Sequence, residues 1–276
     1  MSAVSTGTVG EALSAATDAL AAAGAESPRL DAELLLAEAT GLDRARLTAG
    51  AELGVGPAAA RAFGAMVRRR IQREPVAYIL GRRGFRRIEL AVDGRVLIPR
   101  PETELLVEVA VELQPASVLE IGTGSGAVAL AVADELEGVS VVATDTSLDA
   151  LAVAAANLAR VGGNVSLAHG SVPADERFDL VLANLPYVAE GDLAELAPEI
   201  GRYEPREALV AGPTGLEVID AVLGELALAV PRHGAVALEV AAGQAVTVSE
   251  LMRRAGYERV EIRRDLAGID RVVLGQ

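Results

Sequence analysis

The amino-acid sequence predicts an α/β fold: a mostly parallel, seven-stranded sheet with an antiparallel hairpin at its C-terminal end, preceded by a small all-helical region. Three observations lead to this fold class. From about residue 100 onward, short β-branched runs alternate with helical stretches, the order typical of βαβ units. Before residue 76 the pattern is helical only. After the last helical stretch, two strand-like runs follow one another directly, which favours an antiparallel pair because parallel strands need a long crossover.

Residues 1–75 are expected to form a helical domain. One helix is marked by Ser27 and Pro28 at its start and by Gly41 at its end, since Ser caps helices, Pro suits the first position and Gly follows the last turn. A later helix stops before Pro75. The region shows no strand pattern and no catalytic constellation of side chains.

Residues 76–98 are expected to form a β-hairpin-like connector. The β-prone runs are Ala77–Gly81, Gly84–Leu90 and Val96–Pro99, separated by glycines. Arginines gather here and just before, either as a solvated face paired with nearby acids or as a contact surface for an anionic partner. They are Arg68, Arg69, Arg70, Arg73, Arg82, Arg83, Arg86 and Arg87.

Residues 99–276 are expected to form the α/β domain. In such a sheet, ligands bind at the carboxyl ends of the parallel strands. The expected strands are 117–122, 139–145, 164–170, 178–184, 234–240, 260–265 and 270–275, and the expected helices are 102–113, 126–136, 147–160, 213–229 and 243–255.

Composition and charge exclude several classes of protein. A formal net charge of −14 argues against nonspecific binding to a nucleic-acid backbone. The absence of cysteine excludes disulfides and thiolate metal sites. The first 20 residues carry no basic n-region, and no apolar run reaches the length of a membrane span. We therefore expect a cytoplasmic monomer without a metal.

The first candidate site follows the first strand of the α/β domain. Gly122, Thr123, Gly124, Ser125 and Gly126 form a G-x-G-x-G loop, in which glycines allow tight turns and close approach of a ligand. A lone glycine-rich loop is weak evidence for any one cofactor, since other nucleotide cofactors also bind to such loops. The spacing differs from the dinucleotide G-x-G-x-x-G, and an acid just before the loop, Glu120, is typical of methyltransferases.

The second candidate site is Asp145, the last residue of the second strand. A carboxylate at this place can accept two hydrogen bonds from the hydroxyls of a ribose. The alternative is a structural role as N-cap of the helix that starts near Leu148, for which Thr146 and Ser147 are better placed. We expect Asp145 to bind the cofactor ribose.

The third candidate site, Asn184-Leu185-Pro186-Tyr187, follows the fourth strand. Asn and Pro also form ordinary turns. An Asn-x-Pro-Tyr loop here, however, is how amino-methyltransferases hold a planar nitrogen: the Asn oxygen and a backbone carbonyl accept its N–H hydrogens, and the Tyr ring covers its face. Such orientation compensates for a poorly nucleophilic nitrogen. Asn184 and Tyr187 are therefore the predicted catalytic residues.

Further motifs carry a resemblance to a known family. They are Arg73–Gly81 (R-E-P-V-A-Y-I-L-G), Leu97–Glu104 (L-I-P-R-P-E-T-E), Tyr203–Arg206 (Y-E-P-R), Gly215–Glu217 (G-L-E) and the C-terminal R-D-L-A-G-I-D-R-V-V-L-G. In this order, over about 200 residues, they resemble the release factor glutamine methyltransferases, and the order of strands resembles the class I methyltransferase Rossmann-like fold.

The resemblance implies a helical substrate-recognition domain, a connector and an S-adenosylmethionine-dependent domain. It implies methyl transfer to the side-chain amide of the Gln in the Gly-Gly-Gln motif of peptide chain release factors. Residues 122–126 and Asp145 would then hold the cofactor, with Asn184 close to its methionine end, and residues 184–187 would hold the substrate Gln.

Two departures from the family pattern affect the site. Leu185 replaces the first Pro of the usual Asn-Pro-Pro-Tyr, and Ser171-Val172 replaces an acid and an aromatic near the adenine. Asn-Leu-Pro-Tyr also occurs in adenine N6-methyltransferases that act on RNA, which keeps a nucleic-acid substrate open. The sequence is also compatible with a ribosomal-protein glutamine methyltransferase and with a cofactor-binding module that has lost turnover.

Overall fold

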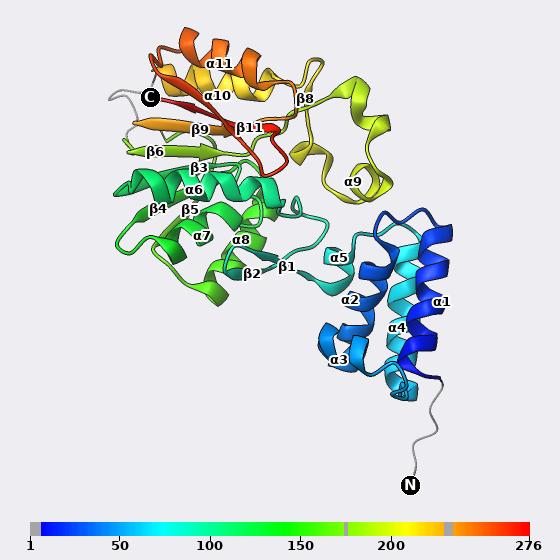
Figure 1. Ribbon diagram of the computed structural model, residues 1–276. Coiled ribbons are helices and arrows are strands. Elements are labelled where there is room, and N and C mark those ends of the chain that lie inside the picture. Colours follow the sequence, from blue (N-terminus) through cyan, green and yellow to red (C-terminus); the bar gives the residue numbers. More distant parts are fainter. Residues whose placement is uncertain (1–6, 174–175, 229–233) are drawn as a thin grey trace. The chain divides into compact units, whose positions relative to one another are not determined.

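The computed structural model describes residues 7–173, 176–228 and 234–276, which form two compact units (Figure 1). The first unit contains the residues up to Gly81 together with Pro198–Tyr203. The second contains Arg82–Ala197 and Glu204–Gln276. The expected helices form the first unit and the expected seven-stranded sheet lies in the second, so the predicted fold class is confirmed.

The first unit is all-helical. Its core is mainly aliphatic, with Leu13, Leu20 and Leu35 almost fully buried. Pro28 and Gly41 begin and end a helix as expected, whereas Ser27 makes no side-chain capping bond. The helices are α1 (Val9–Ala22), α2 (Pro28–Thr40), α3 (Arg44–Ala49), α4 (Pro57–Ile71), α5 (Val76–Leu80) and α9 (Pro198–Tyr203).

The connector is only partly a hairpin. The run at Gly84–Leu90 lies in an antiparallel pair, β1 (Arg82–Phe85) and β2 (Ile88–Ala91). The run at Ala77–Gly81, expected as β-prone, is helix α5 instead. Pro75 precedes this helix, and Gly81 ends it with a left-handed φ of 70°, so the end signals outweigh the β-prone side chains. The run at Val96–Pro99 lies outside the strands.

The seven-stranded sheet has the order β10-β11-β9-β6-β3-β4-β5. Its strands are parallel except β11, which is antiparallel to both of its neighbours. All seven expected strands are present. They are β3 (Ser117–Ile121), β4 (Ser140–Asp145), β5 (Val165–His169), β6 (Leu180–Ala183), β9 (Ala235–Glu239), β10 (Val260–Arg264) and β11 (Asp270–Gly275).

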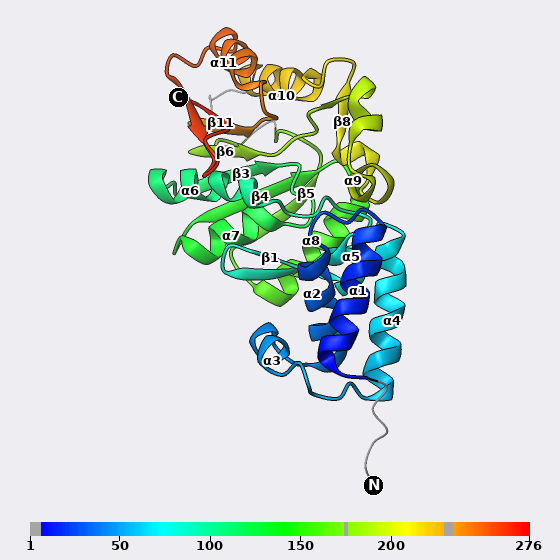
Figure 2. The same ribbon diagram turned by 45° about the vertical axis from the view of Figure 1, so that its right-hand side comes forward.

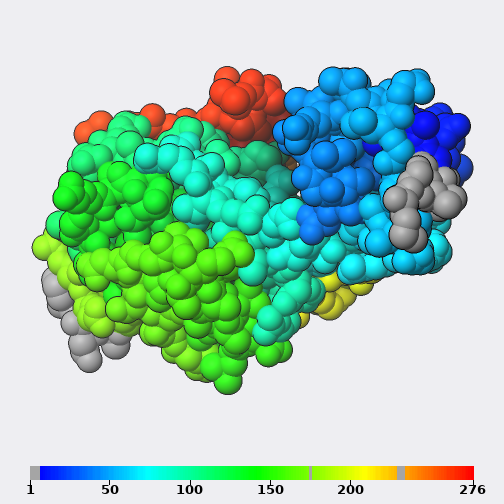
Figure 3. Space-filling view, turned by 90° about the horizontal axis from the view of Figure 1, so that it is seen from below, coloured from blue at the N-terminus to red at the C-terminus, as the bar shows by residue number. Residues whose placement is uncertain are grey.

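Helices cover both faces of this sheet (Figures 1 and 2). Along β6, Leu180 and Leu182 face a core shared with α6 (Glu104–Leu113) and α7 (Ala127–Glu135). Val181 and Ala183 face the opposite core, beneath α10 (Glu217–Leu228) and α11 (Ala245–Arg254). Alternation along a strand sends successive side chains to opposite faces. The outer surfaces of α7 and α8 (Leu148–Val161) form much of the green area in Figure 3.

Several short elements were not expected from the sequence. Strands β7 (Val188–Ala189) and β8 (Val210–Gly212) form a small parallel pair, and three 3₁₀ turns lie near them or before α6. The turns are η1 (Pro101–Thr103), η2 (Glu190–Glu195) and η3 (Arg206–Ala208). The turns η1 and η3 supply residues to the pocket described below, which forms at the carboxyl ends of β3, β4 and β6.

Candidate functional site

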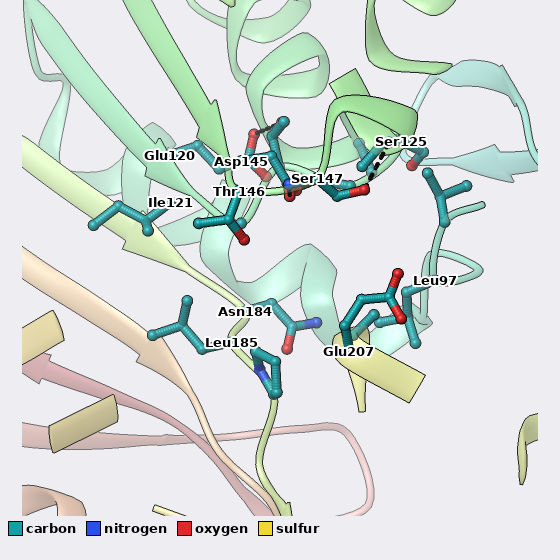
Figure 4. Close-up of a pocket in the computed structure, with 18 of the residues that line it drawn as sticks. Leu97, Glu120, Ile121, Ser125, Asp145, Thr146, Ser147, Asn184, Leu185 and Glu207 are labelled. Carbon is teal, nitrogen blue, oxygen red and sulfur yellow. Dashed lines mark hydrogen bonds between the residues drawn. The ribbon is translucent and has the colours of Figure 1, made fainter. Parts of the chain in front are cut away.

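A single pocket in the second unit collects the three predicted segments (Figure 4). It lies at the carboxyl ends of β3, β4 and β6, which are neighbours in the sheet. From the predicted site it is lined by Gly122, Thr123, Gly124, Ser125, Asp145, Asn184, Leu185 and Pro186. Gly126 and Tyr187 are not among the lining residues, so two of the ten predicted site residues border the pocket only through their chain neighbours.

The glycine-rich loop is held in shape by backbone hydrogen bonds. The amides of Gly122 and Thr123 both donate to the carbonyl of Thr144 at 2.9 Å. Gly124 has a φ of 55°, and a Cβ there would meet no atom within 4 Å. The backbone at Gly124 therefore takes a conformation that favours glycine and borders open pocket space.

Glu120 ties this loop to the start of α7. One carboxylate oxygen accepts from the Thr123 hydroxyl at 2.6 Å and from the amide of Ala129 at 3.0 Å. The amide of Ala129 belongs to the first turn of the helix, so one of the donors at this helix start is already occupied. Burial raises the pKa of Glu120 to about 8, despite these donors. Glu120 is thus mainly protonated at neutral pH.

The Asp145 carboxylate connects the glycine loop to the start of α8 through hydrogen bonds. One of its carboxylate oxygens accepts from the amide of Gly124 at 2.8 Å, and the other accepts from the amide of Ser147 at 2.8 Å. The N-cap of α8 is Ser147, whose hydroxyl accepts from Ala150. The capping role considered for Asp145 is therefore filled by another residue, and the Asp145 carboxylate faces the pocket (Figure 4).

Asn184 is held by a side chain that was not singled out from the sequence. Its Nδ2 donates to the hydroxyl of Thr103 at 3.1 Å. Thr103 belongs to η1, is 4% exposed and also lines the pocket. With Nδ2 engaged, the Asn184 Oδ1 is the atom of this amide left to accept a hydrogen bond from a ligand.

The backbone of Tyr187 is fixed from α11. Its carbonyl accepts from the Gln244 side chain at 3.0 Å. Gly215 packs so closely on this carbonyl that a Cβ would lie 2.5 Å from it. Burial, followed by the charge of Glu239, raises the pKa of Tyr187 to about 12, so its phenol stays neutral. The position of the tyrosine thus depends on residues about 28 and 57 places further along the chain.

The opposite wall of the pocket comes from residues around η3. Pro205, Glu207 and Ala208 line it, and Glu207 and Leu97 lie together on one side of Figure 4. Glu204 precedes this segment and forms an ion pair with Arg100. Burial raises the pKa of Glu204, although Arg100 opposes this shift. Both residues occur in the family motifs, but nothing in the pattern indicated that they would pair.

One further polar atom at this site lacks a partner. The hydroxyl of Ser171 is buried and makes no hydrogen bond with the residues that the structure describes, and Ser171 lines the pocket. Buried polar atoms are nearly always satisfied by protein, water or ligand. Ser171 therefore marks a place where a ligand could donate or accept.

Most of the arginines before and within the connector are paired with acids, which favours a solvated face over a contact surface for an anionic partner. Glu199 of α9 is held within the first unit by two of them. Burial would raise its pKa, but the hydrogen bonds from Arg73 and Arg70 prevail and lower it to about 2. The pairs are Arg69–Glu74, Arg70–Asp31, Arg70–Glu199, Arg73–Glu199, Arg82–Glu89, Arg86–Glu135 and Arg87–Glu135.

Two kinds of feature are absent from the described ranges. No helix there is long and apolar enough to cross a membrane. No group of three or more His, Asp or Glu side chains in those ranges is placed to hold a metal ion.

Comparisons with known proteins agree with this geometry. Residues 11–81 match the family description "PrmC N-terminal domain", and residues 118–203 match "Methyltransferase domain". The release factor glutamine methyltransferase of Geobacter sulfurreducens is 40% identical over 93% of this chain and 92% of its own length. That of Gloeobacter violaceus is 42% identical over 88% of each chain.

Solved structures show the same fold at low sequence identity. The hMettl16 catalytic domain in complex with a 3′UTR hairpin gives a TM-score of 0.56 at 15% identity, over 68% of this chain and 75% of that one. A methyltransferase from Pyrococcus furiosus gives 0.50 at 20% identity, over 67% and 87%. Full-length similarity to the curated relatives is far more specific than this shared fold: the chain belongs to the release factor glutamine methyltransferase family.

Proposed function

We propose that this protein methylates the N5 amide nitrogen of the glutamine in the Gly-Gly-Gln motif of peptide chain release factors, with S-adenosylmethionine as the methyl donor, and so supports translation termination. Membership of the family supports the reaction. The observation that carries the proposal is one pocket in which the glycine loop, Asp145 and the amide of Asn184 meet. A cofactor and a planar amide could both reach this pocket.

The residues present fit S-adenosylmethionine. Gly124 leaves room for a ligand against the backbone, and Asp145 offers carboxylate oxygens to ribose hydroxyls. The unpartnered hydroxyl of Ser171 could meet a polar edge of the adenine. When bound, this cofactor supplies an electrophilic methyl group on a sulfonium sulfur. We assign residues 122–126 and Asp145 to cofactor binding, with Asn184 close to the methionine end.

The chain's own residues orient the nucleophile. The Oδ1 of Asn184 accepts one N–H of the substrate amide, and a backbone carbonyl of the Leu185-Pro186 segment accepts the other. The ring of Tyr187 covers the flat face of the amide. An amide nitrogen is a weak nucleophile, so this alignment is expected to account for much of the rate. Asn184 and Tyr187 are the catalytic residues of the proposal, and residues 184–187 form the substrate site.

The domain roles are part of the same proposal. We assign substrate recognition to the helical region 1–75, a connecting role to 76–98 and methyl transfer to 99–276. Because Glu199 pairs with Arg70 and Arg73, truncating the helical region would also disturb α9. A milder test is Arg68→Glu, since Arg68 is exposed and forms no ion pair with any described residue. This change should raise the Michaelis constant for an intact release factor and leave that for a short Gly-Gly-Gln peptide unchanged.

Mass spectrometry of a release factor incubated with the protein and S-adenosylmethionine tests the function. The expected product carries one additional methyl group on the Gly-Gly-Gln glutamine. The matched control is the same factor with that glutamine changed to Ala, which should stay unmodified. Methylation of the control would overturn the proposed acceptor, and methylation of RNA or of a ribosomal protein in its place would identify a different substrate class. We further expect a cytoplasmic monomer that needs no metal.

A further inference from the structure

Asn157 of α8 is 0% exposed although its side chain is polar. Burying a polar side chain is unfavourable unless its atoms are hydrogen-bonded. The Oδ1 of Asn157 accepts from the amide of Ala91 at 2.7 Å, and its Nδ2 donates to the carbonyls of Ala91 and Ser125, each at 2.9 Å. One buried amide therefore joins α8 to two separate segments of the chain.

The partners of Asn157 fix the orientation of its amide. A backbone N–H can only donate and a carbonyl oxygen can only accept. The N–H of Ala91 must therefore face the Asn157 oxygen, and the carbonyls of Ala91 and Ser125 must face its NH₂ group. A half-turn of the amide would set donor against donor and acceptor against acceptor. The two segments are thus held in one arrangement relative to each other.

The first segment is the glycine loop, since Ser125 belongs to it and lines the pocket (Figure 4). Glu120 and Asp145 hold this loop at earlier residues and at the start of α7. Asn157 adds a further bond between those points. The next residue, Gly126, has a left-handed φ of 83°, and a Cβ there would lie 3.5 Å from a methyl group of α8. Helix α8 therefore packs directly on the last part of the loop.

The second segment leads into another wall of the pocket. Ala91 is the last residue of β2, and residues 95–97 and Pro99, which follow it closely, line the pocket. The turn between them is closed, because the amide of Val96 donates to the carbonyl of Asp93 at 3.1 Å. Val96 is also 1% exposed, so this segment is anchored in the core. The position of Ala91 therefore determines where this wall of the pocket begins.

We propose that Asn157 is a positioning residue for the cofactor, which holds Ser125 of the glycine loop and the wall that follows Ala91 in fixed relation to each other. Both walls are then ordered before S-adenosylmethionine enters, so binding does not have to order them. Asn157 is not among the residues that line the pocket, and it acts through these two backbone segments. This inference rests on the proposed function, since it takes the glycine loop as the cofactor site.

A purely structural residue would hold the hairpin against α8 without affecting the cofactor, and Arg160 separates the two roles. Its guanidinium, one turn further along α8, donates to the carbonyl of Glu89 in β2. Arg160→Ala therefore removes a bond between α8 and β2 and keeps the bond to Ser125. Leu158→Ala is a second control, because it removes an apolar contact of α8 with the core of the sheet and keeps all three bonds of Asn157.

Asn157→Ala removes all three bonds, and Asn157→Asp keeps the volume but sets a carboxylate oxygen against two carbonyls. We expect each to raise the calorimetric dissociation constant for S-adenosylmethionine by about tenfold or more, the effect of one or two lost hydrogen bonds. At saturating cofactor, kcat and the Michaelis constant for the release factor should stay within about threefold of the original values, because the bonds of Asn157 go only to Ala91 and Ser125. Arg160→Ala and Leu158→Ala should change the dissociation constant by less than about twofold.

Several results would overturn the inference. These are an unchanged dissociation constant in either Asn157 variant that folds, an equal loss of affinity in Arg160→Ala, or a fall in kcat at saturating cofactor as large as the loss of affinity. If neither Asn157 variant folds in excess cofactor, as judged by circular dichroism, the residue is structural and the inference is wrong. Failure of the proposed function looks different: the unsubstituted protein itself would then bind no S-adenosylmethionine or leave the release factor unmethylated.

Discussion

Glu120 makes the stability of the protein depend on pH, and a single substitution can remove this contribution. Burial raises its pKa from 4.5 to about 8, with a smaller contribution from the nearby Asp145 carboxylate. Between these two values the folded protein keeps a proton that the unfolded chain has released. The stability that the protonated Glu120 contributes is therefore complete below about pH 4.5 and is lost as the pH rises through about 8.

The size of this effect follows from the linkage between proton binding and folding. Each pH unit inside the window lowers the free energy of unfolding by about 1.4 kcal/mol. Over the whole window the loss from Glu120 alone is roughly 3–5 kcal/mol, a large part of the 5–15 kcal/mol typical of a domain. Glu120→Gln removes the titration, and its oxygen can still accept from Thr123 and Ala129.

Urea unfolding of both proteins at several pH values between about 5 and 8 measures this difference. The free energy of unfolding of the Gln variant should rise relative to that of the original protein by about 1 kcal/mol for each pH unit. Other buried acids titrate in both proteins and cancel in the comparison. The Asp145 carboxylate is one of the charges that raise the pKa of Glu120. Asp145→Asn, introduced into the original protein, should therefore lower the pKa of Glu120, and the loss of stability should stop at a lower pH. A stability difference that stays constant from pH 5 to pH 8 would refute the reasoning.

The remaining predictions concern the ligands. Gly124→Val should abolish cofactor binding in calorimetry, whereas the control Gly138→Val should not, since both residues have a left-handed φ and open space at Cβ but only Gly124 lines the pocket. Equal cofactor affinities of the two variants would contradict the assignment of Gly124. Asp145→Ala should weaken cofactor binding by roughly 2–3 kcal/mol through two lost hydrogen bonds, and an unchanged dissociation constant would exclude the ribose role. Asn184→Ala and Tyr187→Ala should each lower turnover by about 100-fold or more, measured as methyl transfer to a release factor, with much smaller changes in cofactor affinity; undiminished turnover would point to another nucleophile-holding group.

The elements of the sheet were predictable because their signals are local. Each expected strand is a short β-branched run between turn residues, and each became a strand within one or two residues. The run at Ala77–Gly81 carried the same signal and became a helix. Five residues are too few for periodicity to separate strand from helix. The flanking Pro75 and the left-handed Gly81 decided the outcome, and they were readable as helix end signals.

The site was predictable where one side chain at a strand end carries the chemistry. The rule that singled out Asp145 at the end of β4 does not bring every acid at a strand end into the site: Glu239 ends β9 and is not among the residues that line the pocket. The partnership of Thr103 with Asn184 was beyond reach, because 81 residues separate them and only the folded sheet brings them together.

Leu185 shows why a departure from a family motif has to be judged in the fold. A proline at this position would stiffen the backbone before Pro186, because its ring fixes φ. The structure gives Leu185 a different means of rigidity: its side chain is 5% exposed and packs in the core beneath α10 and α11. Its Cδ2 also lies 3.5 Å from the Cβ position of Gly122. A buried leucine that loses its side chain costs about 2–5 kcal/mol. The packing of the Leu185 side chain therefore restrains the loop that carries Asn184, whereas the usual proline would restrain it through its own fixed φ.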